Sequence, residues 1–291
     1  FEYATFDEYV DYTSENKIQQ RSNNGGTVLA RVIEIGGGKA VLTFSREDYF
    51  YRENFLKKAS NMGDILLMEP IKVGTTWTLK DGRVKTITGT NVKVETPSGT
   101  YMTVAVKTDY GVGNTSINYY APGIGLVKVL TYGEDFEVSS SLSEIQRDIK
   151  LKHTIRFYYP SATDGVLLYK DSEVSFKTND ITRKVLETAY KQLPEGFSGK
   201  VFSENTRINS LYLNDDGMVY LDLSNDFVTE MNAGSDYEAM LLQCVANTFG
   251  SYYGAERVIL TIDNGLYESG HIKLEKGQYL TVKTENSVEI T

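Results

Sequence analysis

The sequence predicts a two-domain protein, in which an N-terminal all-β antiparallel domain, curved like a half barrel, precedes a C-terminal α+β domain. The chain has 291 residues, and single hydrophobic cores rarely grow much beyond about 250–300 residues. Apolar and polar residues alternate through the first half, whereas helical spacing of apolar residues begins only in the second half. We expect domains at 1–140 and 153–291, joined by a Ser-rich polar linker at 141–152.

Composition supports a folded, β-rich and acidic protein. Apolar residues make up 41% and charged residues 24% of the chain, which is ordinary for a globular protein. The chain has 21 Tyr but only 5 Pro, and with frequent Thr, Val and Gly this favours strands joined by tight turns. A net charge of -9 argues against binding to nucleic acid or to an anionic membrane surface, because no basic field attracts phosphates.

The sequence contains one cysteine, Cys244, in an apolar helical pattern. One cysteine excludes a disulfide framework and makes a cysteine-containing zinc site very improbable. A sparing use of cysteine suits the envelope of Gram-positive bacteria, and it also suits many cytosolic proteins. The sequence begins at Phe1 without Met and has no long apolar stretch. We therefore expect membrane attachment only through a lipid or helical anchor upstream of Phe1.

Strands and hairpins account for most of the first domain. Glycines 36–38 predict a hairpin between strands 27–35 and 39–45, because glycine takes positive φ without steric cost. Asp81-Gly82 is a second hairpin signal. The remaining apolar segments predict further strands at 75–80, 84–96, 100–111 and 115–133. Residues 46–60 are either a helix or an irregular strand, since their aromatic spacing fits neither well.

The second domain begins with two strands, at 153–160 and 165–176, with a turn at Asp164-Gly165. Apolar residues at helical spacing then predict a helix over 180–193, closed by Pro194. The next signals are strands 208–214 and 218–224 on either side of 215–217, Asp-Asp-Gly, the clearest hairpin signal in the chain.

A second helix is predicted from Ser235, where Ser235 and Glu238 form a capping box that satisfies free backbone N–H groups. Gly250 is expected to end this helix. Residues 257–263 form a nearly continuous apolar run, as in a strand at the centre of a sheet. The order of elements predicts two helices packed on one face of a mixed sheet.

The stretch 263–272, Asp-Asn-Gly-Leu-Tyr-Glu-Ser-Gly-His-Ile, contains the ingredients of a hydrolase site: Asp263, Glu268, Ser269 and His271. A nucleophilic serine needs a base within hydrogen-bond distance. In an extended segment, Ser269 and His271 point to opposite faces and cannot meet. No Gly-x-Ser-x-Gly elbow surrounds Ser269. We therefore expect a turn at the dipeptides 264–265 and 269–270 that leads into an edge strand, with a structural role for His271.

Metal and phosphate sites are not predicted, and we expect no cofactor. The histidines, His153 and His271, lie far from each other and from Cys244, without the paired spacing of zinc ligands. The Asp-Asp-Gly at 215–217 does not fit the calcium-loop pattern. Residues 36–39, Gly-Gly-Gly-Lys, lack the first glycine and the Ser or Thr of a phosphate loop, and they lead into a strand.

Acidic pairs and aromatic clusters leave the position of a site unknown. Glu134 with Asp135 is one carboxylate pair and Asp215 with Asp216 is another, but an acidic protein contains such pairs by chance. The aromatic segments 49–55 and 251–254 are either a ligand or partner surface or ordinary cross-strand packing. No coherent catalytic set emerges, and the sequence predicts a protein without enzymatic activity.

Residues 206–274 resemble the GerM-type sporulation and spore germination domain. The resemblance is carried by the hairpin strand Val-Tyr-Leu-Asp-Leu-Ser (219–224), the following Asp-Phe, and the helix start Asn-Ala-Gly-Ser-x-x-Glu-Ala (232–239). The strand Val-Ile-Leu-Thr-Ile-Asp (258–263) and the closing Glu-Ser-Gly-His-Ile (268–272) complete it. The pattern covers most of 153–281. The N-terminal half resembles a β-rich module of Firmicutes envelope lipoproteins, through segments 69–82, 92–108 and 119–128.

The resemblance implies an extracytoplasmic, membrane- or lipid-anchored protein of the cell envelope. GerM-type domains are similar to the ring-building modules of sporulation complexes, which associate through helix and sheet faces. The expected partners are therefore a second copy of this chain or another envelope protein. A solute- or peptide-binding lipoprotein is the first alternative, and a hydrolase of the envelope is the second.

Overall fold

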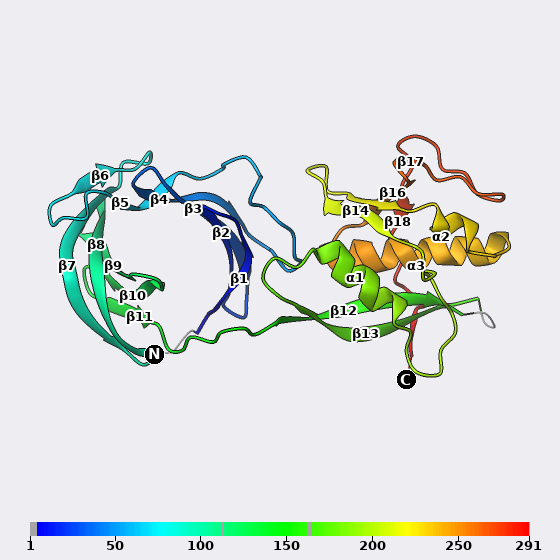
Figure 1. Cartoon of the computed structure of the whole chain (residues 1–291), viewed down its shortest axis with the longest axis horizontal. Coiled ribbons are helices and arrows are strands. Elements are labelled where there is room, and N and C mark those ends of the chain that lie inside the picture. The colour runs from blue at the N-terminus through cyan, green and yellow to red at the C-terminus, as the bar shows by residue number, and fades with distance from the viewer. Residues whose placement is uncertain (1–4, 112, 162–164, 291) are drawn as a thin grey trace. The chain divides into compact units, whose positions relative to one another are not determined.

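The computed structural model describes residues 5–111, 113–161 and 165–290, which form two compact units (Figure 1). The N-terminal unit comprises Phe1–Tyr49 and Asn54–Ile149. The C-terminal unit comprises Lys150–Thr291 together with the tetrapeptide Phe50–Glu53, which comes from the first fifth of the sequence. No helix in the described part of the chain is long and apolar enough to cross a lipid bilayer.

The described residues of the N-terminal unit form two antiparallel sheets; the sequence predicts the antiparallel all-β class but not the division into two sheets. The first sheet places its strands in sequence order: β1 (Asp7–Thr13), β2 (Lys17–Asn23), β3 (Val28–Gly36), β4 (Lys39–Arg46) and β5 (Asp64–Met68). The second sheet has the order β11-β10-β9-β8-β7-β6, with strands β6 (Thr76–Thr78), β7 (Val84–Thr96), β8 (Gly99–Gly111), β9 (Asn114–Ala121), β10 (Gly125–Tyr132) and β11 (Glu137–Ser141). Both sheets curve in the half-barrel manner that was expected (Figure 1).

Local turn chemistry explains the hairpins of this unit. Gly37 and Gly38 adopt φ of 56° and 72° between β3 and β4, and Gly82 adopts φ of 89° between β6 and β7. Such positive φ values favour glycine. The predicted strand 115–133 is two strands, β9 and β10, because Pro-Gly-Ile at 122–124 turns the chain. The predicted linker 141–152 overlaps a strand at each end, because Ser141 is the last residue of β11 and Leu151 is the first of the strand that follows the linker.

A small apolar core joins the two sheets of the N-terminal unit. Trp77 of β6 and Ile87 of β7 are buried and pack against Ile65 of β5. The indole N–H of Trp77 donates to the carbonyl of Ile65 at 3.1 Å, so the only tryptophan has a partner for its polar atom. The ammonium of Lys85 also bonds Ile65 and forms an ion pair with Asp64.

Residues 47–60 form neither the helix nor the strand that their composition left open. Tyr49 and Phe55 insert their rings into the N-terminal unit, where each is almost fully buried. Buried Gln19 bonds both of them: its amide nitrogen donates to the Tyr49 hydroxyl at 3.0 Å and its oxygen accepts from the Phe55 N–H at 2.7 Å. Arg21 donates to the Tyr49 carbonyl at 2.7 Å. Side chains thus satisfy the backbone without regular secondary structure.

Arg52 anchors the tetrapeptide Phe50–Glu53 within the C-terminal unit. Its guanidinium is fully buried and donates to the carbonyls of Asp180 at 2.6 Å and Lys177 at 3.0 Å. The same group donates to the Thr182 hydroxyl at 3.1 Å. These acceptors lie at the turn before α1, so a charged residue remote in sequence orders the start of that helix.

In the part of the C-terminal unit that the structure describes, there are two sheets and three helices. One sheet has the order β12-β13-β19, with β12 (Leu151–Pro160), β13 (Leu167–Phe176) and β19 (Val288–Glu289). The mixed sheet has the order β14-β15-β16-β17, with β14 (Ile208–Leu213), β15 (Val219–Leu223), β16 (Arg257–Ile262), β17 (Gly265–Leu266) and, also paired with β16, β18 (Leu280–Thr281). The helices are α1 (Thr182–Lys191), α2 (Asp226–Thr229) and α3 (Ser235–Tyr253). Asp164 of the predicted turn lies outside the described residues.

The α+β class, with helices on a mixed sheet, is confirmed. The strands nevertheless divide into two sheets, and α3 packs against both: against β12 of one, and against β15, β16 and β18 of the other (Figure 1). The core between them is rich in aromatic rings. Tyr190 of α1 lies 4.9 Å from Phe202 and 5.9 Å from Phe249 of α3, measured between ring centroids. This arrangement explains why α3 is apolar on more than one side.

Two predicted features of α3 are wrong. Its N-cap residue is Gly234, and no side chain caps the helix, so Ser235 and Glu238 form no capping box. The helix also continues through Gly250 and ends at Gly254, which adopts the left-handed φ of 66°. Gly250 serves packing instead, because a Cβ atom at this position would collide with Val282.

Replacing Arg52 should destabilise the protein far more than replacing an exposed arginine. Arg52→Ala leaves several buried acceptors without a donor, and we expect the free energy of unfolding to fall by about 2–4 kcal/mol. Exposed Arg147 is the matched control, and Arg147→Ala should stay within about 0.5 kcal/mol of the parent. Urea unfolding followed by circular dichroism measures both. Equal stabilities of the two variants would contradict the anchoring role of Arg52.

Gly250→Ala tests whether close packing or helix propensity decides at this position. Alanine is the better helix former by about 1 kcal/mol, but its Cβ would strike Val282 and approach the Ala255 carbonyl at 3.0 Å. We expect a net loss of about 1–3 kcal/mol in thermal or urea unfolding. Gly270→Ala, with no heavy atom within 4 Å of the new Cβ, should be nearly neutral. A stabilised Gly250→Ala protein would refute the packing explanation.

Candidate functional site

The stretch 263–272 begins with a two-residue hairpin between β16 and β17. Ile262 pairs with Gly265, so Asp263 and Asn264 are the turn residues, with φ of 47° and 66°. Positive φ at both positions is typical of a type I′ turn, which Asn and Asp tolerate. The sequence predicted the turn at Asn264-Gly265, one residue too late. The short edge strand that follows, β17, is as expected.

Ser269 and His271 do not form a catalytic pair. The Ser269 hydroxyl donates to the Glu238 carboxylate at 2.5 Å and accepts from the backbone N–H groups of His271 and Ile272, each at 3.0 Å. The side chain of His271 is exposed. The Ser269 hydroxyl therefore bonds the backbone N–H of His271 and not its ring, and it stabilises a tight turn instead of facing a base. Glu268 is also exposed, beside Lys273.

Glu238 is a buried carboxylate at the start of α3, with an exposed fraction of 1%. It accepts from the hydroxyl of Tyr267 at 2.7 Å as well as from Ser269. Burial, and then the hydrogen bond to Glu238, raise the pKa of Tyr267 far above its usual value, so the phenol keeps its proton and acts as donor. This contact, between groups far apart in sequence, is the physical reason why Glu238 does not cap its own helix.

Asp222 of β15 holds the 263–264 hairpin in place. Its carboxylate is buried and accepts from the Thr261 hydroxyl at 2.5 Å and the Asn264 N–H at 2.7 Å. The side-chain amide of Asn209 donates both to Asp222 at 2.9 Å and to Asp263 at 3.0 Å. The acidic residues of the two motif strands are thus joined by one amide, in a network that fixes backbone geometry.

The other candidate residues lie apart from one another. His153 is on β12 and packs edge-on against Phe176 at 5.7 Å. Cys244 is buried in α3, where burial raises the pKa of its thiol far above the usual range and makes it a poor nucleophile. Asp216 is exposed and accepts from the Met218 N–H and the Tyr220 hydroxyl within its hairpin. Asp215 lies beside it, also exposed.

Both acidic pairs are exposed, and the rings of the two aromatic segments are mostly buried or half-buried. Glu134 and Asp135 are exposed in the turn between β10 and β11. For the aromatic segment 49–55, the alternative of a ligand or partner surface is wrong, because three of its four rings are buried and only Phe50, 59% exposed, faces solvent. In the segment 251–254, Tyr253 is buried and Tyr252 is half-buried. Among the described residues, no group of three His, Cys, Asp or Glu side chains could hold a metal ion.

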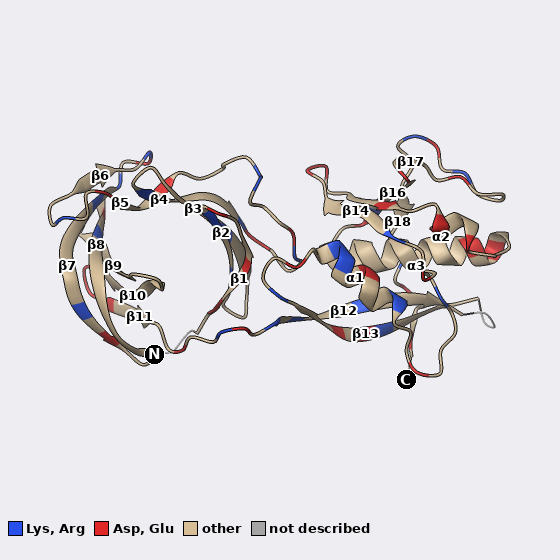
Figure 2. Ribbon diagram, viewed as in Figure 1, with Lys and Arg blue, Asp and Glu red and all other residues tan. Residues whose placement is uncertain are grey.

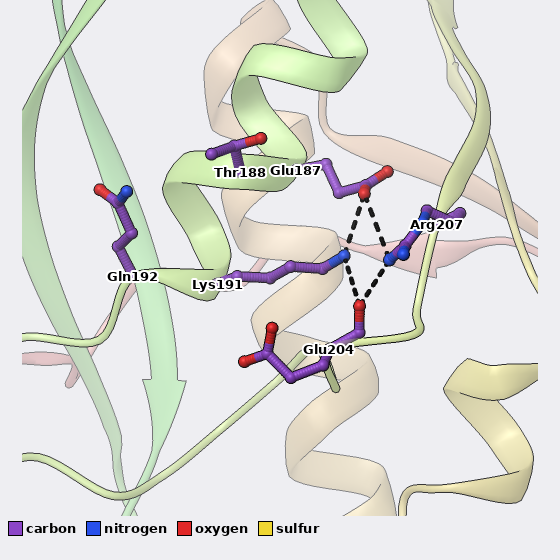
Figure 3. A pocket seen from close by; sticks show the side chains of 6 residues that line it. All are labelled: Glu187, Thr188, Lys191, Gln192, Glu204 and Arg207. Atoms are coloured by element: carbon purple, nitrogen blue, oxygen red, sulfur yellow. Dashed lines mark hydrogen bonds and ion pairs between the residues drawn. The ribbon is translucent and has the colours of Figure 1, made fainter.

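A charged depression lies beside α1 in the C-terminal unit and has a volume of about 510 Å³ (Figure 3). We call it the α1 depression; it is lined by Glu187, Thr188, Lys191, Gln192, Glu204 and Arg207. A second depression of about 450 Å³ shares three of these residues and continues along the helix past Arg183 and Lys184. Figure 2 shows these basic positions on α1. The acidic protein thus has a locally mixed, partly basic surface here.

Glu187 is the centre of the α1 depression. One carboxylate oxygen forms ion pairs with Lys191 at 2.9 Å and with Arg207 at 3.7 Å (Figure 3). The other oxygen accepts from the backbone N–H of Ile208 at 2.8 Å. Arg183, one turn earlier on α1, donates to the carbonyl of the same Ile208 at 2.7 Å. Two side chains of α1 therefore take the place of a neighbouring strand at the edge of β14.

In the α1 depression, the carboxylate is bonded within the protein and one cation is exposed. The Glu187 carboxylate is committed to two cations and one N–H, so it is not positioned as a general base. Arg207, whose side chain is 53% exposed, is the cation of the depression that a carboxylate ligand could best reach. This site was not predicted from the sequence. Its only sequence signal was the Glu187–Lys191 spacing of four on a predicted helix, since Arg207 and Ile208 approach only in the folded chain.

Four polar residues of the motif hold the strands, the turns and the start of α3 together within the C-terminal unit: Asp222, Glu238, Asp263 and Ser269. Residues 156–268 match a family model described as Germane, sporulation and spore germination. The match begins in β12 and ends in the stretch after β17. The resemblance inferred from the sequence is thereby confirmed for the C-terminal half.

The structure is similar to a crystal structure of a candidate lipoprotein from Clostridium perfringens, with 14% sequence identity and a TM-score of 0.30. That similarity covers 47% of this chain and 91% of the other. No curated protein matches the chain.

Replacing Ser269 should cost stability because its hydroxyl satisfies two backbone N–H groups and Glu238. For Ser269→Ala we expect the free energy of unfolding to fall by about 1–3 kcal/mol. His271→Ala, which removes an exposed ring, should change it by less than about 0.5 kcal/mol. Chemical unfolding monitored by tyrosine fluorescence compares the two. The assignment fails if Ser269→Ala is neutral and His271→Ala is the destabilising change.

Proposed function

We propose that this protein is a non-enzymatic, extracytoplasmic protein of the cell envelope that acts in sporulation or spore germination. The observation that carries the proposal is the Germane match over residues 156–268. In this proposal the C-terminal unit binds another envelope protein or a second copy of the chain.

The candidate catalytic side chains are already bonded to other groups of the protein, which supports a non-enzymatic role. The hydroxyl most suited to be a nucleophile, that of Ser269, is bonded to Glu238 and to two backbone N–H groups. The carboxylate of Glu187 is held by cations and by Ile208. A catalytic constellation needs a nucleophile or base that is oriented toward substrate, and these groups are oriented toward the protein itself.

The outer face of the mixed sheet supports a role in association. Leu221 and Val258 point to the buried side of the sheet, so Tyr220 and Ile259, their neighbours along the chain, point to the opposite side. Tyr212 pairs with Tyr220 across the strands, and the rings lie 5.6 Å apart. Tyr279, which is 44% exposed and directly precedes β18, lies under the guanidinium of Arg257 of β16. Exposed aromatic residues of this kind are enriched in protein interfaces.

A deletion strain tests the proposed function. In a spore-forming bacterium that carries the gene, its removal should lower the yield of heat-resistant spores or slow their germination, and the intact gene should restore both. The His271→Ala gene should restore them as well, because the imidazole has no chemical role in this proposal. Normal spores from the deletion strain would contradict the role in sporulation or germination. Failure of His271→Ala, with the protein present at its normal level, would indicate catalysis.

A further inference from the structure

The outer edge of β12 leaves a run of backbone hydrogen-bonding groups without a neighbouring strand. In the sheet order β12-β13-β19, the ten-residue strand β12 has β13 on one side, and the described residues place no strand on its other side. Its pairing with β13 is antiparallel and regular, without a bulge, from Leu151 to Pro160. Regular pairing means that backbone groups alternate strictly between the two sides along the strand.

Tyr158 shows which residues face outward. Its N–H donates to the hydroxyl of Thr248 at 3.0 Å, and its carbonyl accepts from the hydroxyl of Tyr190 at 2.6 Å. Both backbone groups of Tyr158 therefore point away from β13. In an antiparallel pair, every second residue behaves in the same way. The N–H and C=O groups of Arg156, Thr154 and Lys152 consequently face outward too.

The edge of β14 is partly covered by side chains, unlike this stretch of the β12 edge. At the edge of β14, α1 satisfies both backbone groups of Ile208, and Glu53 accepts from the Leu213 N–H at 3.4 Å. At the far end of β12, helix side chains satisfy Tyr158. Within the described residues, no such partner binds the outward backbone groups from Lys152 to Arg156. An open edge of this kind is the usual receptor for an added strand.

We propose that the edge of β12 from Lys152 to Arg156 accepts an extended acidic segment of a partner protein as an additional β-strand. This inference rests on the proposed function and deepens it, since it names one surface and one class of partner.

Charge selects the partner. Lys152 and Arg156 lie on the same face of the strand, with side chains 65% and 42% exposed. The carboxylates that pair with them, Glu173 and Asp171, belong to β13, so they lie on the side of β12 opposite to an added strand. A strand added on the outer side places its own residues beside the two cations, and opposite charges at directly paired positions are favourable. The added segment should therefore carry carboxylates at two positions separated by four residues.

Repulsion between like charges disfavours a second copy of this strand as the partner. Two β12 strands paired antiparallel about Thr154, the register that joins all three outward residues, would place Lys152 of one copy beside Arg156 of the other. Like charges at directly opposed positions are destabilising. Symmetric self-association through this edge is therefore the weaker alternative, and binding of an acidic segment is the stronger one.

A short labelled peptide tests the proposal on the purified full chain. The probe is Val-Glu-Val-Thr-Val-Glu-Val, and fluorescence anisotropy measures its binding. One control peptide carries methyl groups on the backbone nitrogens of alternate residues, which removes donors needed for a strand pair. A second control replaces both glutamates with lysine. We expect each control to bind at least about tenfold more weakly than the probe. Equal binding of the methylated peptide, or no binding of the probe, would overturn the proposal.

Two protein variants make the same test from the other side. Thr154→Pro removes an outward N–H that β13 does not use, and prolines are tolerated at such edge positions; Thr154→Val keeps the N–H. We expect loss of probe binding for the first and retention for the second, with similar circular dichroism spectra. Lys152→Glu leaves one carboxylate and one cation, Arg156, on this face, so it should abolish the preference for the glutamate over the lysine peptide, a result that does not depend on the proline variant folding. An unchanged preference would refute the assigned edge.

The binding assay and the deletion strain fail independently. The assay uses purified protein and no host, so a negative result removes the edge site and leaves the sporulation role to the genetic test.

Discussion

Every backbone N–H and C=O that is shielded from water needs a hydrogen-bond partner, and the C-terminal unit depends on how its helices supply them. Its two sheets are small and have several edges, because the strands divide between two sides of α3. Glu187 and Arg183 bond both backbone groups of Ile208. Hydroxyls from α1 and α3 do the same for Tyr158. These contacts fix the position of each helix against a strand end, which apolar packing alone would not specify.

The residues of the Germane motif serve the same purpose at the turns. Asp222 accepts from the Asn264 N–H and so holds the hairpin between β16 and β17. Glu238 receives two hydroxyl groups and ties the start of α3 to the segment after β17. The carboxylates and hydroxyls of the motif, which resemble a catalytic set in the sequence, are therefore bonded to other groups of the protein. Their residue types follow from geometry, since short side chains with fixed acceptors satisfy local backbone groups best.

Sequence patterns identified the elements that local chemistry determines. The hairpin at 215–217 and the helix from Thr182 follow from turn residues and apolar period, so they were predictable. The capping box failed because Glu238 bonds Tyr267, 29 residues away, and Gly250 failed as a helix end because a contact with Val282 requires it. The α1 depression needs Ile208 beside Glu187, which only the tertiary fold provides. Local sequence rules assign Glu238 and Gly250 a role at the ends of α3. In the folded chain, a contact with a residue distant in sequence determines the role of each.

The edge of β12 offers a partner two sources of binding energy, which are backbone hydrogen bonds and paired charges. A strand added over Lys152, Thr154 and Arg156 can form only about six backbone hydrogen bonds, each worth about 0.5–1.5 kcal/mol net. Association alone costs several kcal/mol in lost translational and rotational freedom, so backbone bonds by themselves give weak and short-lived binding. They do fix register and direction. Tight binding at this edge therefore requires the paired charges as well, and those make the interaction selective and sensitive to salt.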